Sequence, residues 1–501
     1  MTAFHPSLDD LRVASEHHER AVVAASIIAD GDTPLSLFAR LRDQPGGSFL
    51  LESVEGGERT GRWSFFGAGL TSGFRFADGC VQHFDASGDR AKVGGDPLAA
   101  IRIGLAARRA FLAPELPPFT GGLVGFFAFD ALAGFERVPV AAPLPGAEPD
   151  PDAELMVVDA PYAYDHATHR LYALTEISLA GDLEATMRAA ESALEARLAQ
   201  LAEPISLAPF SPVHADPDTV PRTAHWAPEA FQQAVRTAKE AIAAGEIFQV
   251  VLSQRWTVET SVDPFALYRA MRACNPSPYM FLLSRPKGPT LVGASPEVLV
   301  KVEGSEVSVR PIAGTRARGK TTAEDLERER DLLADEKELA EHRMLLDLGR
   351  NDVGRVAAPG SVRVEAPMHV ERYAHVMHLV SDVIGELAPG KDACDAFRAG
   401  FPAGTVVGAP KLRAAEIVAE LEPHRRGPYS GAVGYFDRSG AMDTCITIRS
   451  LVVHPERVEV QAGAGIVADS DPESEHQECQ NKARSPFAAI ALAQSASRSS
   501  S

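Results

Sequence analysis

The sequence predicts an α+β fold, in which helices and strands are mixed along the chain. Runs rich in β-branched and aromatic residues indicate strands at 247–255, 279–284, 306–311, 432–437, 444–453 and 458–462. Apolar residues recur at helical spacing around these runs. Because strands and helices do not alternate as regular βαβ units, the pattern favours α+β over a doubly wound parallel sheet.

Helices and a linker are predicted ahead of the strand-rich part. Residues 183–201 carry apolar side chains at helical spacing, which is typical of a half-exposed surface helix. Prolines from Pro204 to Pro221 indicate a linker. Pro228 then opens a helix that Gly245 closes. We therefore divide the chain into an N-terminal region 1–205, a linker 206–225, a main domain 226–490 and a disordered tail 491–501.

Composition and charge narrow the class of function. The chain has 501 residues and a formal net charge of −19, so we expect neither a nucleic-acid nor a membrane partner, since both need a basic face. Its five cysteines include no CxxC pair, which disfavours a zinc site or a disulfide framework and fits a reducing cytoplasm. No signal peptide and no apolar run of about 18 residues is visible.

The acidic stretch 331–350 reads as one helix with carboxylates on an apolar stripe. Glu338 and Glu341 lie three residues apart and share this stripe with Leu345 and Leu348. Two such carboxylates repel each other and lose hydration, so either their pKa values rise or a cation compensates them. Spacing alone also allows a solvated helix face.

A second acidic pair lies near the C-terminus. Ser470 and Glu473 resemble a capping box, after which Glu475, Glu478 and Lys482 share one helical stripe. If the two acidic helices face each other, four carboxylates surround one space. Oxygen ligands with room for water suit Mg²⁺.

Two glycine segments and one arginine could contact an anion. Residues 462–465 end a predicted strand just before the acidic helix, and Gly314 follows another strand. Such turns let backbone N–H groups approach an anion, although each is also compatible with a plain turn. Arg449 lies in an apolar strand-like run, where a guanidinium needs a carboxylate partner, either structural or from a substrate.

Taken together, a set of segments between about 245 and 485 resembles the chorismate-utilising enzymes, which include anthranilate synthase component I, aminodeoxychorismate synthase component I, and the isochorismate and salicylate synthases. The segments are GASPEVLV, RPIAGTRARG, DEKELAEHRMLLDLGRNDVGRV, HVMHLVSDVIG, FPAGTVVGAPK, GPYSGAVGYF, DTCITIRS and QAGAGIVADSDPESEHQECQNKA. The resemblance implies a large mixed α/β body of antiparallel sheets packed as a sandwich and flanked by helices. Residues 226–490 would bind chorismate.

The resemblance also implies a magnesium site. Glu341 and Glu478 resemble the direct Mg²⁺ ligands, and Glu338 and Glu475 their neighbours, which hold the metal directly or through water. The metal would grip the ring carboxylate of chorismate. Lys482 would lie beside it as a fixed positive charge.

Catalytic and substrate-binding roles are implied in the same way. Glu297 resembles the general acid that protonates the departing C4 hydroxyl, which is otherwise a poor leaving group. His378 resembles the histidine needed for enolpyruvyl elimination. The residues implied to contact chorismate are Gly314, Thr315, Thr405, Tyr429, Arg449, Gly463, Ala464 and Gly465.

Two positions separate the branches of this family. Members that add water carry a lysine base where this chain has Gln249, and aminodeoxychorismate synthases usually carry a nucleophilic lysine where it has Ala313. Ammonia must then add directly, which indicates anthranilate synthase, the first step of tryptophan biosynthesis. Aminodeoxychorismate synthase component I is the alternative within the family. A non-catalytic tryptophan or chorismate sensor is the alternative outside it, disfavoured because a sensor need not keep Glu297.

Regulation and partners follow from the same resemblance. A tryptophan feedback site is implied by LLES and NPSPYMF, whose matching residues are Glu52, Ser53, Pro278, Tyr279 and Met280. The role of Arg62 stays open. No cysteine lies in a GxCxG context, so a separate glutamine amidotransferase subunit, component II, would supply the ammonia within a heterotetramer.

Overall fold

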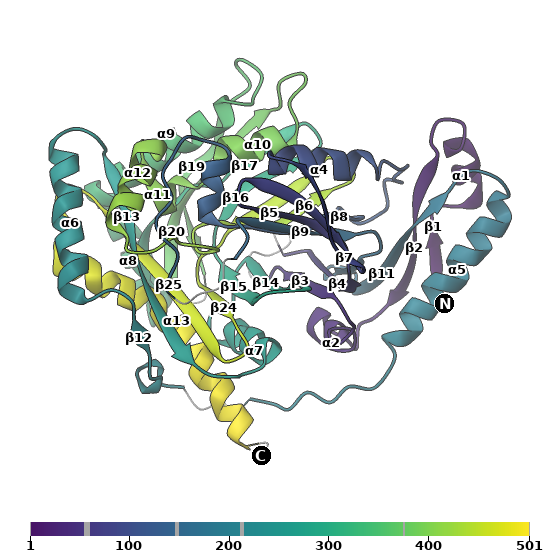
Figure 1. Ribbon diagram of the computed structural model, residues 1–501, viewed down its shortest axis with the longest axis horizontal. Helices are drawn as coiled ribbons and strands as arrows, with labels where there is room; N and C mark the ends of the chain where they lie inside the picture. The colour runs from purple at the N-terminus through teal and green to yellow at the C-terminus, as the bar shows by residue number, and fades with distance from the viewer. Residues whose placement is uncertain (1, 55–60, 146–149, 211–214, 374–375, 500–501) are drawn as a thin grey trace.

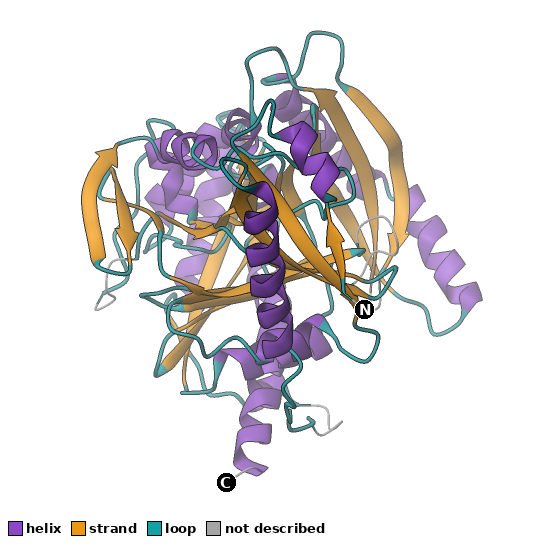
Figure 2. Cartoon of the chain, turned by 90° about the vertical axis from the view of Figure 1, so that its right-hand side faces the viewer, coloured by secondary structure: helices purple, strands orange, loops and turns teal. Residues whose placement is uncertain are grey.

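Two large antiparallel sheets form the body of the molecule (Figure 1). The computed structural model describes residues 2–54, 61–145, 150–210, 215–373 and 376–499. Within these ranges, one sheet has 13 strands and the other has 12. Figure 2 shows strands through the middle of the molecule with helices around them.

The 13-stranded sheet joins strands from both ends of the chain. Its spatial order is β1 (Ala3–His5), β2 (Arg20–Ile28), β11 (Arg170–Ser178), β10 (Tyr162–Asp165), β4 (Trp63–Leu70), β3 (Gly47–Glu52), β14 (Tyr279–Ser284), β15 (Thr290–Ser295), β24 (Ser450–Val453), β25 (Arg457–Ile466), β13 (Gln249–Glu259) and β12 (Thr223–Ala224), with β21 (Gly408–Ala409) beside β13.

The 12-stranded sheet is built in the same way. Its order is β18 (Ile312–Ala317), β20 (Val376–Glu386), β17 (Glu306–Val309), β16 (Val298–Glu303), β23 (Met442–Ile446), β22 (Ala432–Asp437), β8 (Gly122–Phe127), β9 (Ala153–Val158), β5 (Gly73–Ala77), β6 (Cys80–Asp85) and β7 (Gly88–Gly94), with β19 (Arg363–Arg372) beside β20.

Helices cover the outside of the sheets. They are α1 (Leu8–Ala14), α2 (Pro34–Ala39), α4 (Pro97–Ala106), α5 (Leu183–Gln200), α6 (Pro228–Ala243), α7 (Pro264–Cys274), α8 (Thr322–Ala334), α9 (Glu336–Gly354), α10 (Ala393–Gly400), α11 (Gly404–Val407), α12 (Lys411–Leu421) and α13 (Pro472–Ser499), with 3-10 turns at η1 (Phe129–Gly134) and η2 (Pro217–Thr219). In Figure 1, α1 and α5 lie with β1, β2 and β11 in an extension of the body.

An aromatic core holds the two sheets together. Phe49 of β3 and Phe65 of β4 share a buried cluster with Phe126 of β8 and Tyr435 of β22. The rings of Phe65 and Tyr435 lie edge to face with centroids 5.7 Å apart, a favourable aromatic geometry. Since the cluster draws on both sheets, the predicted sandwich of antiparallel sheets is confirmed.

The N-terminal region and the main domain complete the same sheets. Strand β3 pairs with β14, so that Glu52 lies opposite Met280. Strand β8 pairs with β22 in the other sheet. The boundary at 205–226 therefore separates segments of sequence whose strands are interleaved in space.

The structure corrects the predicted helix at 331–350. The chain breaks at Asp335, whose side chain caps α9 by accepting hydrogen bonds from the backbone N–H groups of Lys337 and Glu338. A well-placed Asp cap competes with helix continuation because it satisfies the free N–H groups of a new first turn. Glu338 thus lies in the first turn of a helix rather than in the middle of one.

Corrections also apply near the C-terminus. Asp471 accepts from the backbone of Ser474 at the start of α13, so the expected capping box of Ser470 and Glu473 does not form; Ser470 instead accepts from Val467. The tail predicted to be disordered continues α13 to Ser499, and Leu492 is buried. Packing of this apolar face overrides the polar composition of the final residues.

The predicted strand at 444–453 is divided into β23 and β24. Arg449 lies between them with φ 50°, in the left-handed region. A non-glycine residue in this region is strained and breaks the strand.

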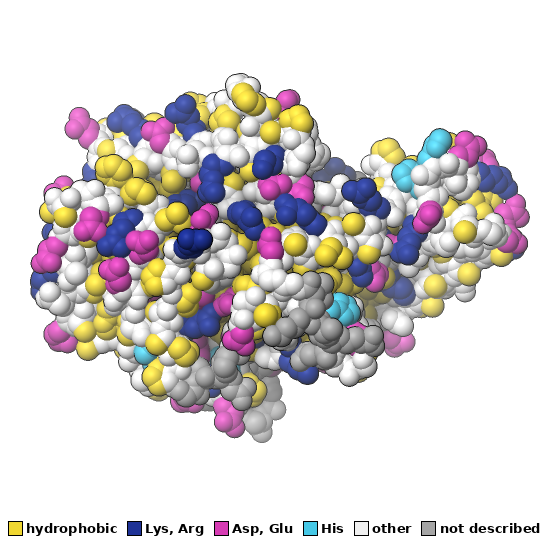
Figure 3. Space-filling view, turned by 45° about the horizontal axis from the view of Figure 1, so that its top comes forward, with side chains coloured by type: hydrophobic (Ala, Val, Ile, Leu, Met, Phe, Trp, Pro, Cys, Tyr) yellow, Lys and Arg dark blue, Asp and Glu magenta, His cyan; other side chains and the backbone are white. Residues whose placement is uncertain are grey.

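The surface carries mixed charge. Acidic and basic side chains are interspersed across the face shown in Figure 3. Among the described residues, no helix has the length and apolar character needed to cross a membrane.

Candidate active site

Acidic side chains of α9 and α13 face one another. Burial raises the pKa of Glu341, and the negative charges of Glu338 and Glu478 raise it further. Burial also raises the pKa of Glu475, with a further contribution from Glu478. Because Glu478 affects carboxyls on both helices, the two acidic pairs predicted from sequence share one electrostatic environment.

Basic side chains partly compensate these carboxylates. Lys482 Nζ lies 2.6 Å from Glu478 Oε1 and donates to the Gly463 carbonyl oxygen at 3.0 Å. Arg316 Nη1 donates to Glu338 Oε1 at 3.2 Å and also pairs with Asp331 and Asp335. Arg316 was not singled out from the sequence, although it directly follows the Gly314-Thr315 pair.

The donor set fits a hard divalent cation. In the part of the chain that the structure describes, no three acidic, histidine or cysteine side chains converge closely enough to share a metal ion as they lie. Yet four carboxyls gather between two helices, and the pKa of Glu341 is raised partly by their mutual repulsion. Carboxylate oxygens with room for water are the ligands that Mg²⁺ prefers.

Glu297 is a buried acid between β15 and β16. It is 8% exposed, and Thr405 Oγ1 donates to its Oε1 at 3.0 Å. Burial raises the pKa of Glu297 to about 8, while the Thr405 hydroxyl and the charge of Lys482 oppose the rise. Glu297 is therefore protonated at neutral pH, which a proton donor requires.

His378 lies on β20 directly opposite Thr315 of β18. Its Nδ1 lies 3.1 Å from the Gly314 carbonyl oxygen and 3.1 Å from Thr315 Oγ1. A carbonyl only accepts, so Nδ1 carries the proton and Nε2 is left as a base. Burial lowers the pKa of His378, and the charge of Arg449 adds to this, which keeps the ring neutral.

Gly314 brings the β18 backbone against the acidic helix. The ladder between β18 and β20 is irregular at this residue, whose φ is 66°. A Cβ atom here would lie 3.2 Å from Glu338 Oε2. Glycine is required both by the left-handed backbone and by this close approach.

Arg449 and Tyr429 lie next to the end of β25. Burial lowers the pKa of Arg449, while Tyr429 and Glu478 oppose the change, so all three groups are neighbours. The Tyr429 hydroxyl lies against Gly463, where a Cβ would be only 2.8 Å from it. Gly465 lies against Gln249 in the same way. A Cβ at position 465 would be 2.6 Å from the side-chain amide nitrogen of Gln249. Ala464 lies between them, paired with Leu252 of β13.

The residues predicted to bind tryptophan lie together where β3 meets β14. Glu52 is 3% exposed, receives a hydrogen bond from the Tyr268 hydroxyl, and lies 3.4 Å from Arg272 Nε. Its Oε1 and the Ser53 hydroxyl have no hydrogen-bond partner among the described residues. Tyr268 and Arg272 lie on α7 and were missed by sequence reasoning, since no local signal links α7 to β3.

The remaining residues of this group lie on β14 or beside it. Tyr279 donates to Asp443 Oδ1 at 3.1 Å. Met280 is buried opposite Glu52, and Pro278 immediately precedes β14. Arg62 contacts a different carboxylate, since its guanidinium lies 2.9 Å from Asp165. Residues 55–60, which follow the LLES segment, lie outside the described residues.

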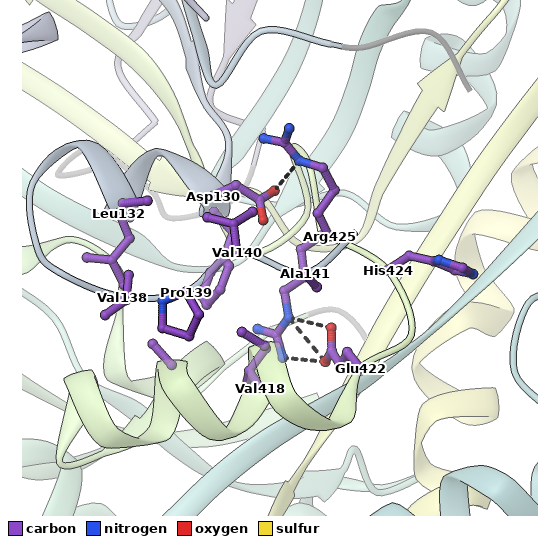
Figure 4. Close-up of a pocket in the computed structure, with 15 residues that line it drawn as sticks. Asp130, Leu132, Val138, Pro139, Val140, Ala141, Val418, Glu422, His424 and Arg425 are labelled. Atoms are coloured by element: carbon purple, nitrogen blue, oxygen red, sulfur yellow. Dashed lines mark hydrogen bonds and ion pairs between the residues drawn. The ribbon is translucent and has the colours of Figure 1, made fainter. Parts of the chain in front are cut away.

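Two other pockets lie away from these residues. One lies between the segment 129–141 and α12, where Val138, Val140 and Val418 line it beside Asp130 and Arg425 (Figure 4). Its free volume is about 20 Å³, room for little more than a water molecule. Another, of about 290 Å³, is lined by 69–72 and Arg197. Neither contains a residue predicted for the site.

Known proteins resemble this chain over nearly its whole length. A family described as chorismate binding enzyme matches residues 49–488. Anthranilate synthase component 1 of Pseudomonas putida is 44% identical over 97% of this chain and 98% of that protein. The protein of the same name from Thermus thermophilus is 46% identical over 94% of this chain and 97% of its own.

Solved structures share the fold. The crystal structure of anthranilate synthase component I from Streptococcus pneumoniae superposes with a TM-score of 0.74, at 35% identity, over 92% of this chain and 99% of that one. The menaquinone-specific isochorismate synthase of Escherichia coli has a TM-score of 0.68 at 21% identity, over 96% and 98%, which shows a common fold alone. From the family match and these relatives, the chain belongs to the chorismate binding enzymes, within the family of anthranilate synthase component 1.

Proposed function

We propose that the chain converts chorismate and ammonia into anthranilate, pyruvate and water in a Mg²⁺-dependent reaction. The observation that carries this proposal is Glu297, a buried carboxyl with a pKa of about 8 that lies near Lys482 and the acidic helices. The loss of the C4 hydroxyl requires an acid that is protonated at neutral pH. The relatives named anthranilate synthase component 1 support the product.

Magnesium would be held by Glu341 and Glu478, with Glu338 and Glu475 beside them. When bound, the ion would neutralise the ring carboxylate of chorismate and withdraw electrons from the ring as a Lewis acid. Mutual repulsion in this acidic set supports the assignment, because a divalent cation relieves it.

The remaining side chains would bind and turn over the substrate. Arg449 and the Tyr429 hydroxyl would hold the enolpyruvyl carboxylate against the backbone of 463–465, where Gly463 leaves room for the phenol. Gly314, Thr315 and Thr405 would line the ring. Glu297 would protonate the C4 hydroxyl, which leaves as water.

Ammonia would attack C2 directly. Ala313 offers no nucleophile, and Gln249, which is buried over Gly465, offers no base for water. His378, neutral with Nε2 unprotonated, would then assist the loss of pyruvate that makes the ring aromatic.

Supply and regulation complete the proposal. A glutamine amidotransferase, component II, would deliver ammonia in a heterotetramer; the name component 1 of the relatives supports the existence of a partner component. L-Tryptophan would inhibit by binding near Glu52, Ser53, Pro278, Tyr279 and Met280, where buried acceptors lack partners. The five free thiols suit the cytoplasm.

The test mixes the purified chain with chorismate, Mg²⁺ and ammonium near pH 8, where about half of Glu297 is still protonated. We expect fluorescent anthranilate and equimolar pyruvate, neither of which forms with Glu297→Gln. A product that keeps the enolpyruvyl group would indicate aminodeoxychorismate synthase instead. Absence of any amine product from the wild-type chain would refute the proposal.

A further inference from the structure

We propose that Asp352 passes protons to Glu297 through water held in a pocket that both side chains line. The inference rests on the proposed function, because it concerns the acid of that reaction. Glu297 donates one proton per turnover and must regain it before the next. In this proposal Asp352 acts through Glu297 and not on the substrate, so it is a positioning residue.

Side chains of α9 line this pocket together with the candidate acid. Its lining includes Glu297, Thr405, Leu348, Ala403 and Asp352. Its free volume is about 40 Å³, which is room for more than one water molecule. Two carboxyls that the sequence places 55 positions apart (352 − 297) thus line one pocket.

Asp352 presents an unused oxygen within this buried environment. Its Oδ2 accepts from Lys411 Nζ at 2.7 Å, and the same ammonium donates to the Gly400 carbonyl at 2.9 Å. Its Oδ1 is buried and has no hydrogen-bond partner among the described residues. A buried carboxylate oxygen is costly without a partner, and the free volume of this pocket gives room for a water molecule to supply one.

Other charged groups of the pocket are already engaged. Arg310 also lines it, but its guanidinium pairs with Glu371 and lies 3.0 Å from Asp382. Thr405 donates to Glu297 Oε1. The carboxyl of Asp352 is therefore the group of this lining that can deliver a proton to Glu297.

The transfer changes only O–H bonds. Protonated Asp352 gives its proton to a pocket water, which gives one of its own to the Glu297 carboxylate. Asp352 becomes a carboxylate stabilised by Lys411 and is reprotonated from solvent water. Burial raises the pKa of Asp352 to about 6 and that of Glu297 to about 8, so the proton moves from the stronger acid, Asp352, to the stronger base, the Glu297 carboxylate, which is the favourable direction.

The test compares Asp352→Asn with Asp347→Asn in the ammonia-dependent assay, using the full chain. Asp347 is an exposed carboxyl on the same helix, paired with Arg350, and serves as the matched control. Asp352→Asn should lower kcat roughly tenfold or more while KM for chorismate changes by less than about twofold. Its kcat should show a larger solvent deuterium isotope effect than wild type and should recover on addition of formic acid. Asp347→Asn should behave as wild type.

A second variant tests the relay if Asp352→Asn does not fold. If Asp352→Asn melts before assay, Ala403→Val tests the same path by filling the pocket while keeping both carboxyls. It should lower kcat and raise the isotope effect. Unchanged kcat in the folded variants, or a loss with neither isotope effect nor rescue, would overturn the relay alone. Failure of the wild-type chain to make anthranilate would overturn the proposed function and the relay together.

Discussion

The raised pKa of Glu297 predicts how turnover depends on pH. With a pKa of about 8, roughly 90% of Glu297 is protonated at pH 7, against about 0.3% for an ordinary carboxyl at 4.5, a gain of about 300-fold in loaded acid. Turnover should therefore fall as pH rises through about 8. Removing the Thr405 hydroxyl, which lowers this pKa, should move the fall to higher pH.

The size of that displacement follows from one hydrogen bond. A hydrogen bond to a carboxylate contributes about 1.5 kcal/mol, and 1.36 kcal/mol corresponds to one pH unit. Thr405→Val should therefore shift the alkaline limb upward by about one pH unit. Thr290→Val is the matched control, since its hydroxyl contacts Ser284 rather than Glu297.

The assay follows anthranilate fluorescence at saturating chorismate and Mg²⁺. Total ammonium is adjusted at each pH so that free ammonia stays constant, which leaves the enzyme as the titrating species. The reasoning would be refuted by an alkaline limb at the same pH in wild type and Thr405→Val, or by turnover that falls already between pH 5 and 6.

The raised pKa of Glu297 also predicts how the free energy of unfolding depends on pH. Because the folded pKa of Glu297 lies above the unfolded value, its contribution to folding is fully present below about pH 4.5 and is lost as pH rises through about 8. The loss is about 5 kcal/mol at most, from 3.5 × 1.36. Glu297→Gln should remove this part of the pH dependence of the unfolding free energy, measured by urea denaturation.

Three further predictions concern the metal, the regulatory site and the core. Glu341→Gln and Glu478→Gln should each abolish Mg²⁺-dependent turnover and weaken Mg²⁺ binding measured by calorimetry, with unchanged circular dichroism; full activity in either would refute the metal assignment. Glu52→Gln should raise the tryptophan concentration needed for half inhibition while leaving uninhibited kcat unchanged, and equal inhibition would contradict the site. Arg426→Met should lower the unfolding free energy by about 3–5 kcal/mol, since it leaves the carboxylate of Glu422 buried without a cationic partner. The double variant Arg426→Met, Glu422→Leu should recover most of this loss. A single variant as stable as wild type would contradict the reasoning.

The candidate site could be predicted largely from local sequence, because its candidate residues lie in short segments. Glu338 and Glu341 share one helix, Glu475, Glu478 and Lys482 share another, and the raised pKa of Glu341 agrees with the predicted crowding. The absent lysines at Gln249 and Ala313 could be read directly from the chain. These features need only helical periodicity or a match of residue type.

Helix boundaries were harder to predict from the sequence, because alternative capping residues are close in energy. Asp335 ends α8 and begins α9 within a run that periodicity alone reads as one helix. Asp471, and not Ser470, accepts the hydrogen bond at the start of α13. A single side-chain hydrogen bond of about 1 kcal/mol decides each case.

The amino-acid sequence was sufficient to identify the family, and it predicts the acid, the carboxylate set and the kind of nucleophile, since each is a property of residue type and local spacing. Tertiary structure was needed to show which distant groups meet: Tyr268 with Glu52, Arg316 with Glu338, and Asp352 with Glu297 in the lining of one pocket. The physical reason is that strand register and the packing of two sheets bring these side chains together. That register is fixed by burial over the whole molecule, and no segment carries it alone.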